Sequence, residues 1–187
     1  HPEVEGTSGQ VKQEVLLVQS AKDVDGLLVN DPDKLSYVTQ TTLSVDDTRS
    51  IIEALKNRFP NIEGPDLRDI CYATQNRQDA VRHLAKVVDI VLVIGSANSS
   101  NSNRLRDLAE EIGVEAHLID GANDICVDWF KGQECTVGIT AGASAPEILL
   151  ERVLDRLSQF AEIKLSTMDG VSENVKFKIP SELEEAA

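Results

Sequence analysis

The sequence predicts an α/β protein made of repeated β–α–β units with mainly parallel sheets. Short aliphatic runs alternate with amphipathic segments along most of the 187 residues, and this order is typical of parallel strands joined by helices. Aromatic residues are few, with four Phe, two Tyr and one Trp. The core must therefore be packed by Val, Ile, Leu and Ala, as in buried parallel strands.

The first part of the chain, as far as the break at Gly64 and Pro65, contains two strand-like runs, each followed by an amphipathic segment. Strands are predicted over residues 14–20 and 34–41, and helices over 21–29 and 45–59. Two strands are too few for an independent sheet domain. Residues 1–65 are therefore interpreted as part of an α/β domain.

The remainder of the chain shows a longer alternation. Strands are predicted over residues 89–95, 115–120 and 135–140, and helical or amphipathic segments over 69–88, 103–113, 123–132 and 146–160. These elements predict a second α/β domain over residues 66–160. Residues 161–187 are interpreted as a C-terminal tail with one strand, at 174–179.

Charge and cysteine content exclude several classes of protein. The net charge of −14 argues against a nucleic-acid partner or an anionic membrane. No apolar run approaches the roughly 20 residues needed to cross a bilayer, and no secretion signal opens the sequence. These features favour a cytoplasmic protein. The chain has three cysteines, Cys71, Cys126 and Cys135, and they form no CxxC pair. This number and spacing argue against a disulfide framework or a zinc site.

Three strand-to-helix junctions share one chemistry. Residues 37–47, 93–103 and 138–147 each leave a strand through Ser, Thr, Asn and Gly. Ligands of open α/β sheets bind beyond the carboxyl ends of the strands, where such loops converge. The three junctions are therefore expected to line one pocket.

Helix capping accounts for only part of these polar residues. Ser44 with Asp47, and Ser144 with Glu147, fit the capping-box pattern. The run 98–103 instead offers six candidates where one helix needs one cap. Surplus short donors at a helix N-terminus suit a phosphate-type anion, although a solvated polar loop is the alternative. Neither a GxGxxG nor a GxxxxGK[ST] motif is present, so no nucleotide site is indicated.

Five motifs carry a family resemblance. They read HPEVEGT, TQTTLSVDDT, DICYATQNRQ, GSANSSNSNRL and TAGASAPEILL, in that order. On these motifs, residues 1–180 resemble the 4-hydroxy-3-methylbut-2-enyl diphosphate reductase family, also called IspH or LytB. The resemblance implies three α/β domains around a central [4Fe-4S] cluster. It also implies reductive dehydroxylation of the allylic diphosphate to isopentenyl and dimethylallyl diphosphate, the last step of the non-mevalonate isoprenoid route.

The resemblance also implies that an iron–sulfur site is incomplete in this chain. The family holds its cluster with three cysteines, and only Cys71 matches a ligand position. The other two ligands and two diphosphate-binding histidines belong to an N-terminal region that is absent from the sequence given. Residues 1–65 would then be part of the second domain and 66–160 the third. One thiolate does not make a cluster site, so activity is expected of the intact parent protein and not of this fragment.

Individual roles follow from the matched motifs. Glu3, in the motif HPEVEGT, matches the proton donor of the family. An acid suits this role because a carboxyl group shielded from water can hold a proton at neutral pH. His1 matches a diphosphate ligand that also relays protons, and Thr41 matches a hydroxyl that binds substrate and passes the proton on. The diphosphate cradle is expected at Ser99, Ser100, Asn101 and Ser144.

Some further expectations accompany these roles. Thr42 and Thr74 are expected as neighbours of the site, and Ser102 or Asn103 is left to cap the central helix. A ferredoxin- or flavodoxin-type protein is expected as electron donor. A cluster-free α/β module that binds phosphorylated metabolites is the alternative function. A Rossmann-type oxidoreductase is a weaker one, because the glycine fingerprint is missing.

Overall fold

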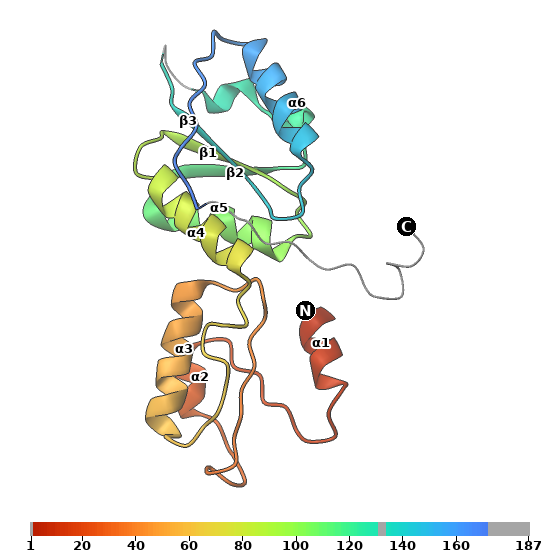
Figure 1. Cartoon of the computed structure of the whole chain (residues 1–187), viewed down its shortest axis with the longest axis vertical. Helices are drawn as coiled ribbons and strands as arrows, with labels where there is room; N and C mark the ends of the chain where they lie inside the picture. The colour runs from red at the N-terminus through yellow and green to blue at the C-terminus, as the bar shows by residue number, and fades with distance from the viewer. Residues whose placement is uncertain (1, 131–133, 172–187) are drawn as a thin grey trace, which may run out of the picture.

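The computed structural model describes residues 2–130 and 134–171, in two packed parts (Figure 1). The N-terminal part contains three helices: α1 (Pro2–Ser8), α2 (Ala21–Asp25) and α3 (Val45–Arg58). The C-terminal part contains α4 (Tyr72–Leu84), β1 (Ile90–Ile94), α5 (Ser100–Ile112), β2 (Glu115–Ile119), β3 (Val137–Ala141) and α6 (Glu147–Ser158). Two short 3₁₀ helices, η1 (Ala122–Asp124) and η2 (Val127–Trp129), lie between β2 and β3.

The C-terminal part is organised by a parallel sheet of three strands in the order β2-β1-β3. Val91 of the central strand pairs with Ala116 on one side and with Gly138 on the other. All five residues of β1 are buried, which explains why this strand is a continuous aliphatic run. The predicted α/β class with a parallel sheet is confirmed.

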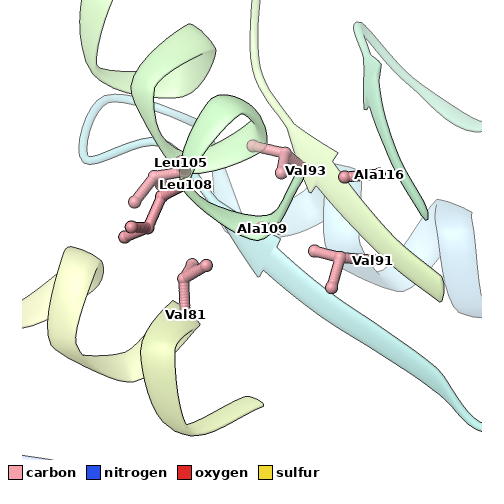
Figure 2. Close-up of a cluster of buried hydrophobic side chains, with 7 residues drawn as sticks. All are labelled: Val81, Val91, Val93, Leu105, Leu108, Ala109 and Ala116. Carbon is pink, nitrogen blue, oxygen red and sulfur yellow. The ribbon is translucent and has the colours of Figure 1, made fainter. Parts of the chain in front are cut away.

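Alternate residues of β1 face two helical layers. Val91 and Val93 pack against α4 and α5, and Figure 2 shows them beside Val81, Leu105 and Leu108. On the other face, α6 covers the sheet, and the buried residues there are Leu92, Ile94, Ile119, Ile125, Val153 and Leu157. The result is a helix–sheet–helix sandwich, in which burial of these aliphatic side chains provides the main stabilisation.

The N-terminal part has a smaller core in which Val24 of α2 packs against Leu55 of α3 and against Phe59, the C-cap residue of that helix. The strands predicted at residues 14–20 and 34–41 are wrong for the described structure. The only strand-type pairing there is an isolated bridge between Ser36 and Glu63. An apolar run forms a strand only when a neighbouring strand supplies hydrogen bonds, and within the described residues none pairs with 14–20.

Several element boundaries differ from the predicted ones. The first predicted helix ends at Asp25 because Gly26 follows as its C-cap, and residues 123–132 form 3₁₀ turns where the structure describes them. The central helix begins at Ser100, three residues earlier than predicted. His1 and the predicted strand at 174–179 lie outside the described residues. The domain limits at 65 and 160 stay predictions.

Within residues 2–130 and 134–171, the structure contains no helix that is both long and apolar enough to span a bilayer.

Candidate functional site

A cavity of about 330 Å³ opens beyond the carboxyl ends of β1 and β3. Its wall includes residues from α1, from the loop before α3, from the start of α4 and from the polar junctions after both strands. The lining residues are Glu3, Thr42, Cys71, Thr74, Asn98, Ser99, Ser100, Asn101, Ala143 and Ser144. The predicted convergence of the three polar junctions on one pocket is therefore confirmed.

The polar run 98–103 builds the N-terminus of α5. Ser99 is the N-cap, and its Oγ accepts hydrogen bonds from Ser102 N at 3.3 Å and from Ser102 Oγ at 3.0 Å. The expectation that Ser102 or Asn103 caps this helix is wrong. Asn103 lies inside the first turn, where its Nδ2 donates to the carbonyls of Ala97 at 2.7 Å and Ser99 at 2.9 Å.

Asn101 is the most unusual member of this run. The residue is among those that line the cavity, although it is only 6% exposed. Within the described part of the chain, neither Nδ2 nor Oδ1 of Asn101 has a hydrogen-bond partner. An unsatisfied buried polar group costs about 1–3 kcal/mol, and native structures keep few of them. Asn101 lies in the first turn of α5, beside the N–H groups at the helix N-terminus.

Two glycines allow α5 to approach the sheet closely. A Cβ atom added at Gly95 would lie 2.1 Å from Ser102 Oγ, and one at Gly142 would lie 2.3 Å from it. These glycines follow β1 and β3, respectively. Because neither carries a side chain, the buried Ser102 fits between the two strand ends and holds the start of α5 at the edge of the sheet.

Cys71 reaches the cavity from the N-cap of α4. Its Sγ accepts a hydrogen bond from Thr74 N at 3.4 Å and lies 3.2 Å from Thr74 Oγ1. The Cys71 amide donates to the Thr41 carbonyl at 3.2 Å, which ties the start of α4 to the loop before α3.

Glu3 enters the cavity from α1, where its Oε2 accepts a hydrogen bond from Gln40 Nε2 at 2.9 Å. Thr42 lines the cavity, whereas the neighbouring Thr41 is exposed and is not among the lining residues. The structure thus places Glu3, Cys71 and Thr42 around one cavity. The role predicted for Thr41 stays a prediction, and His1 lies outside the described residues.

Ser144 lines the opposite wall but does not cap α6. The helix begins at Glu147 with Pro146 as the N-cap residue and no side-chain capping bond. The preceding turn, closed by a bond from Ala145 N to the Gly142 carbonyl at 3.0 Å, leaves Ser144 exposed outside the helix. The predicted capping role is wrong, because the turn sets Ser144 back from the first helical N–H groups. By contrast, Ser44 caps α3 as predicted, accepting from Asp47 N at 3.2 Å.

The thiols of this chain fit an iron–sulfur cluster only in part. Cys126 is exposed, and burial together with Asp89 and Glu115 raises the pKa of Cys135, which disfavours the thiolate that binds iron. Among residues 2–130 and 134–171, no group of three or more His, Cys, Asp or Glu is arranged to hold a metal ion. Among the described residues, Cys71 is the one cysteine that lines the cavity, and these residues do not form a complete cluster site.

Sequence reasoning missed two glutamines near the site. Gln40 contacts Glu3 across 37 positions of the chain, and Gln78 binds the loop before α3 across 33 and 35 positions. Glutamine at such positions carries no local signal. Only the tertiary structure reveals these contacts.

Comparison with known proteins gives a consistent result. A family model described as "LytB protein" matches residues 1–158. The 4-hydroxy-3-methylbut-2-enyl diphosphate reductase of Wolbachia pipientis wMel is 59% identical over 182 residues, covering 97% of this chain and 59% of that protein. The protein of the same name from Azoarcus sp. strain BH72 is 57% identical over 186 residues, covering 100% of this chain and 59% of the relative.

A solved structure agrees over the whole chain. The E-1-hydroxy-2-methyl-but-2-enyl-4-diphosphate reductase from Plasmodium falciparum superposes with a TM-score of 0.85 at 33% identity, covering 100% of this chain and 59% of that one. The chain thus spans about three fifths of the length of the proteins that it matches.

Proposed function

Since this chain belongs to the LytB protein family, we propose that it forms part of an iron–sulfur reductase acting on 4-hydroxy-3-methylbut-2-enyl diphosphate. In the proposed reaction the allylic C–O bond breaks, two electrons and two protons are taken up, and water leaves with isopentenyl or dimethylallyl diphosphate as product. The observation that carries the proposal is that Asn101, whose buried amide has no partner among the described residues, belongs to the lining of one cavity together with Cys71 and Glu3.

The polar lining of the cavity is suited to the diphosphate. Ser99, Ser100, Asn101 and Ser144 would donate hydrogen bonds to its oxygens, together with N–H groups at the start of α5. These donors are neutral, so the helix dipole and hydrogen bonding would hold the anion. His1 is proposed as a further diphosphate ligand. With the diphosphate held by these residues, the carbon chain of the substrate is proposed to extend towards Glu3 and Cys71, which line the same cavity.

Glu3 is proposed as the proton donor. Gln40 donates an N–H to its Oε2 at 2.9 Å, which fixes the carboxyl group at the cavity wall. Thr41 is proposed to pass this proton to the substrate. Thr42 forms the cavity wall beside it.

Cys71 is proposed as one ligand of a [4Fe-4S] cluster, with the other two cysteines supplied by the parent protein outside this chain. When bound, such a cluster supplies the reaction with electrons, which would come from a ferredoxin- or flavodoxin-type donor. The three-domain arrangement around that cluster and a cytoplasmic location are parts of the same proposal. This chain alone is expected to be inactive.

The test uses full-length protein purified without oxygen, with two pairs of variants. Glu3→Gln should keep the iron content and nearly abolish turnover, whereas Glu5→Gln, at an exposed position of the same helix, should change neither. Cys71→Ser should lose iron, whereas Cys126→Ser, at an exposed position, should retain it. Unchanged turnover in Glu3→Gln removes the proton-donor role, and full iron content in Cys71→Ser removes the ligand role.

One observation favours the alternative of a cluster-free module: only one cysteine lines the described cavity. A full-length protein that stays colourless after anaerobic reconstitution with iron and sulfide, yet binds inorganic pyrophosphate, would establish that alternative in place of the reductase.

A further inference from the structure

Gln78 is completely buried in the second turn of α4, at 0% exposure. Its side-chain amide makes two bonds to the loop before α3: Nε2 donates to the Leu43 carbonyl at 2.8 Å, and Oε1 accepts from Val45 N at 3.2 Å. Both ends of the amide are therefore satisfied by one short backbone segment. The glutamine takes the place that a neighbouring strand would occupy beside residues 43–45.

The same segment is held to α4 at a second point. Cys71, the N-cap of α4, donates its amide N–H to the Thr41 carbonyl at 3.2 Å. Cys71 thus holds the segment through its backbone and Gln78 through its side chain. Between these two attachments lies Thr42, which lines the cavity.

Other contacts already join α4 and its preceding turn to this region. Arg82 pairs with Asp46 at 2.6 Å, although the Asp46 side chain is 60% exposed, and Asp69 accepts from Thr39 N at 3.0 Å. These contacts lie outside residues 41–45. Gln78 is therefore not needed merely to keep the two parts together, and its two bonds set the position of the loop itself.

We propose that Gln78 is a positioning residue that holds the Thr41 and Thr42 segment at a fixed distance from the Cys71 sulfur. The inference rests on the proposed function, since it assigns that distance a role in aligning the threonine hydroxyls with a substrate bound beside Cys71. Displacement of a catalytic group by about 1 Å can lower a rate by about 100-fold. Loss of the Gln78 bonds should therefore affect turnover more than diphosphate binding, because the cradle lies mainly on α5.

The two bonds can be removed from either side in the full-length protein. Gln78→Leu removes both. Val45→Pro removes only the N–H donor, because Val45 is the first residue of α3, where proline is tolerated, and Ser44 already has an extended conformation, with ψ of 127°, compatible with a following proline. Val81→Ala is the control: it weakens the buried face of the same helix without touching the loop.

We expect kcat to fall about 100-fold in Gln78→Leu and in the same direction in Val45→Pro, with iron content and substrate Kd close to wild type. Amide hydrogen exchange of residues 41–45 should accelerate in both variants, and the effects should not add in the double variant. Val81→Ala should lower the Tm but leave kcat and exchange in this loop unchanged.

Two results would overturn the proposal: wild-type kcat with unchanged loop exchange in both variants, or losses of kcat that simply follow Tm as in Val81→Ala. If Gln78→Leu does not fold, Val45→Pro alone decides between these outcomes. Failure of the reductase assignment is distinguishable, because the wild-type protein would then lack iron and turnover. In that case hydrogen exchange still tests whether Gln78 holds residues 41–45 in place, and unaltered exchange in Val45→Pro refutes it.

Discussion

Replacement of Asn101 by leucine should separate stability from binding. Both amide atoms of Asn101 are buried and, among the described residues, have no partner. Removing unsatisfied polar atoms relieves about 1–3 kcal/mol, while an imperfect fit of leucine costs below about 1.5 kcal/mol. The free energy of unfolding of the ligand-free full-length protein should therefore change by between about −0.5 and +3 kcal/mol, a range that is mostly stabilising. Lost hydrogen bonds to a charged diphosphate are worth about 1.5–3 kcal/mol, which weakens binding by about 10- to 150-fold.

Urea denaturation of the ligand-free protein and calorimetric titration with the allylic diphosphate measure the two quantities. Asn103→Leu is the matched control, because Asn103 donates to the Ala97 and Ser99 carbonyls and its replacement should lower stability. A destabilised Asn101→Leu protein that binds the diphosphate as tightly as wild type would refute the view that this amide is reserved for a ligand.

Two further predictions concern the frame around the site. Gly95→Ala should destabilise the protein by about 1–3 kcal/mol and weaken diphosphate binding, because its Cβ would lie 2.1 Å from Ser102 Oγ; Gly121→Ala, with no atom within 4 Å of the added Cβ, should be neutral in both assays. The Lys56 ammonium group, hydrogen-bonded to Asp66, holds the pKa of that carboxyl below its ordinary value of 3.8, and the pKa of Lys56 is raised above 10.5 by the same bond. The stabilisation is therefore present between these values, and is lost as pH falls through the lowered pKa or rises through the raised one. When Tm is measured across pH, the Asp66→Asn variant should lose less Tm than the wild type at low and at high pH. Identical Tm curves for the two proteins would contradict the pairing.

The sheet could be predicted because its signals are local. The run 90–94 is aliphatic at every position, and only a strand buried on both faces needs that pattern. The run 14–20 is similarly apolar, yet Val15, Leu16 and Leu17 are 47%, 40% and 58% exposed, and no strand pairs with them in the part of the chain that the structure describes. An apolar pattern reports a tendency to be buried, whereas a strand also needs a neighbour, which the pattern does not report.

The site, like the fold, has one part that the sequence predicts and another that it does not. The surplus of short polar residues at 98–103 is visible in the sequence, and it correctly indicated a pocket at the start of a helix. The sequence did not reveal which serine caps that helix, because Ser99 and Ser102 are equally good caps until Gly95 fixes how closely the helix approaches the sheet. The contacts of Gln40 and Gln78 depend on segments more than 30 positions apart. No spacing rule contains that information.

The central claim is that one cavity joins a diphosphate cradle to an iron ligand. A crystal structure of the full-length protein, grown without oxygen with the allylic diphosphate bound, tests it most directly. The account predicts iron bonded to Cys71 Sγ and diphosphate oxygens at about 2.7–3.2 Å from Asn101 Nδ2 and from a serine hydroxyl at the start of α5. Diphosphate bound away from α5, or a cluster that leaves Cys71 unliganded, would contradict it.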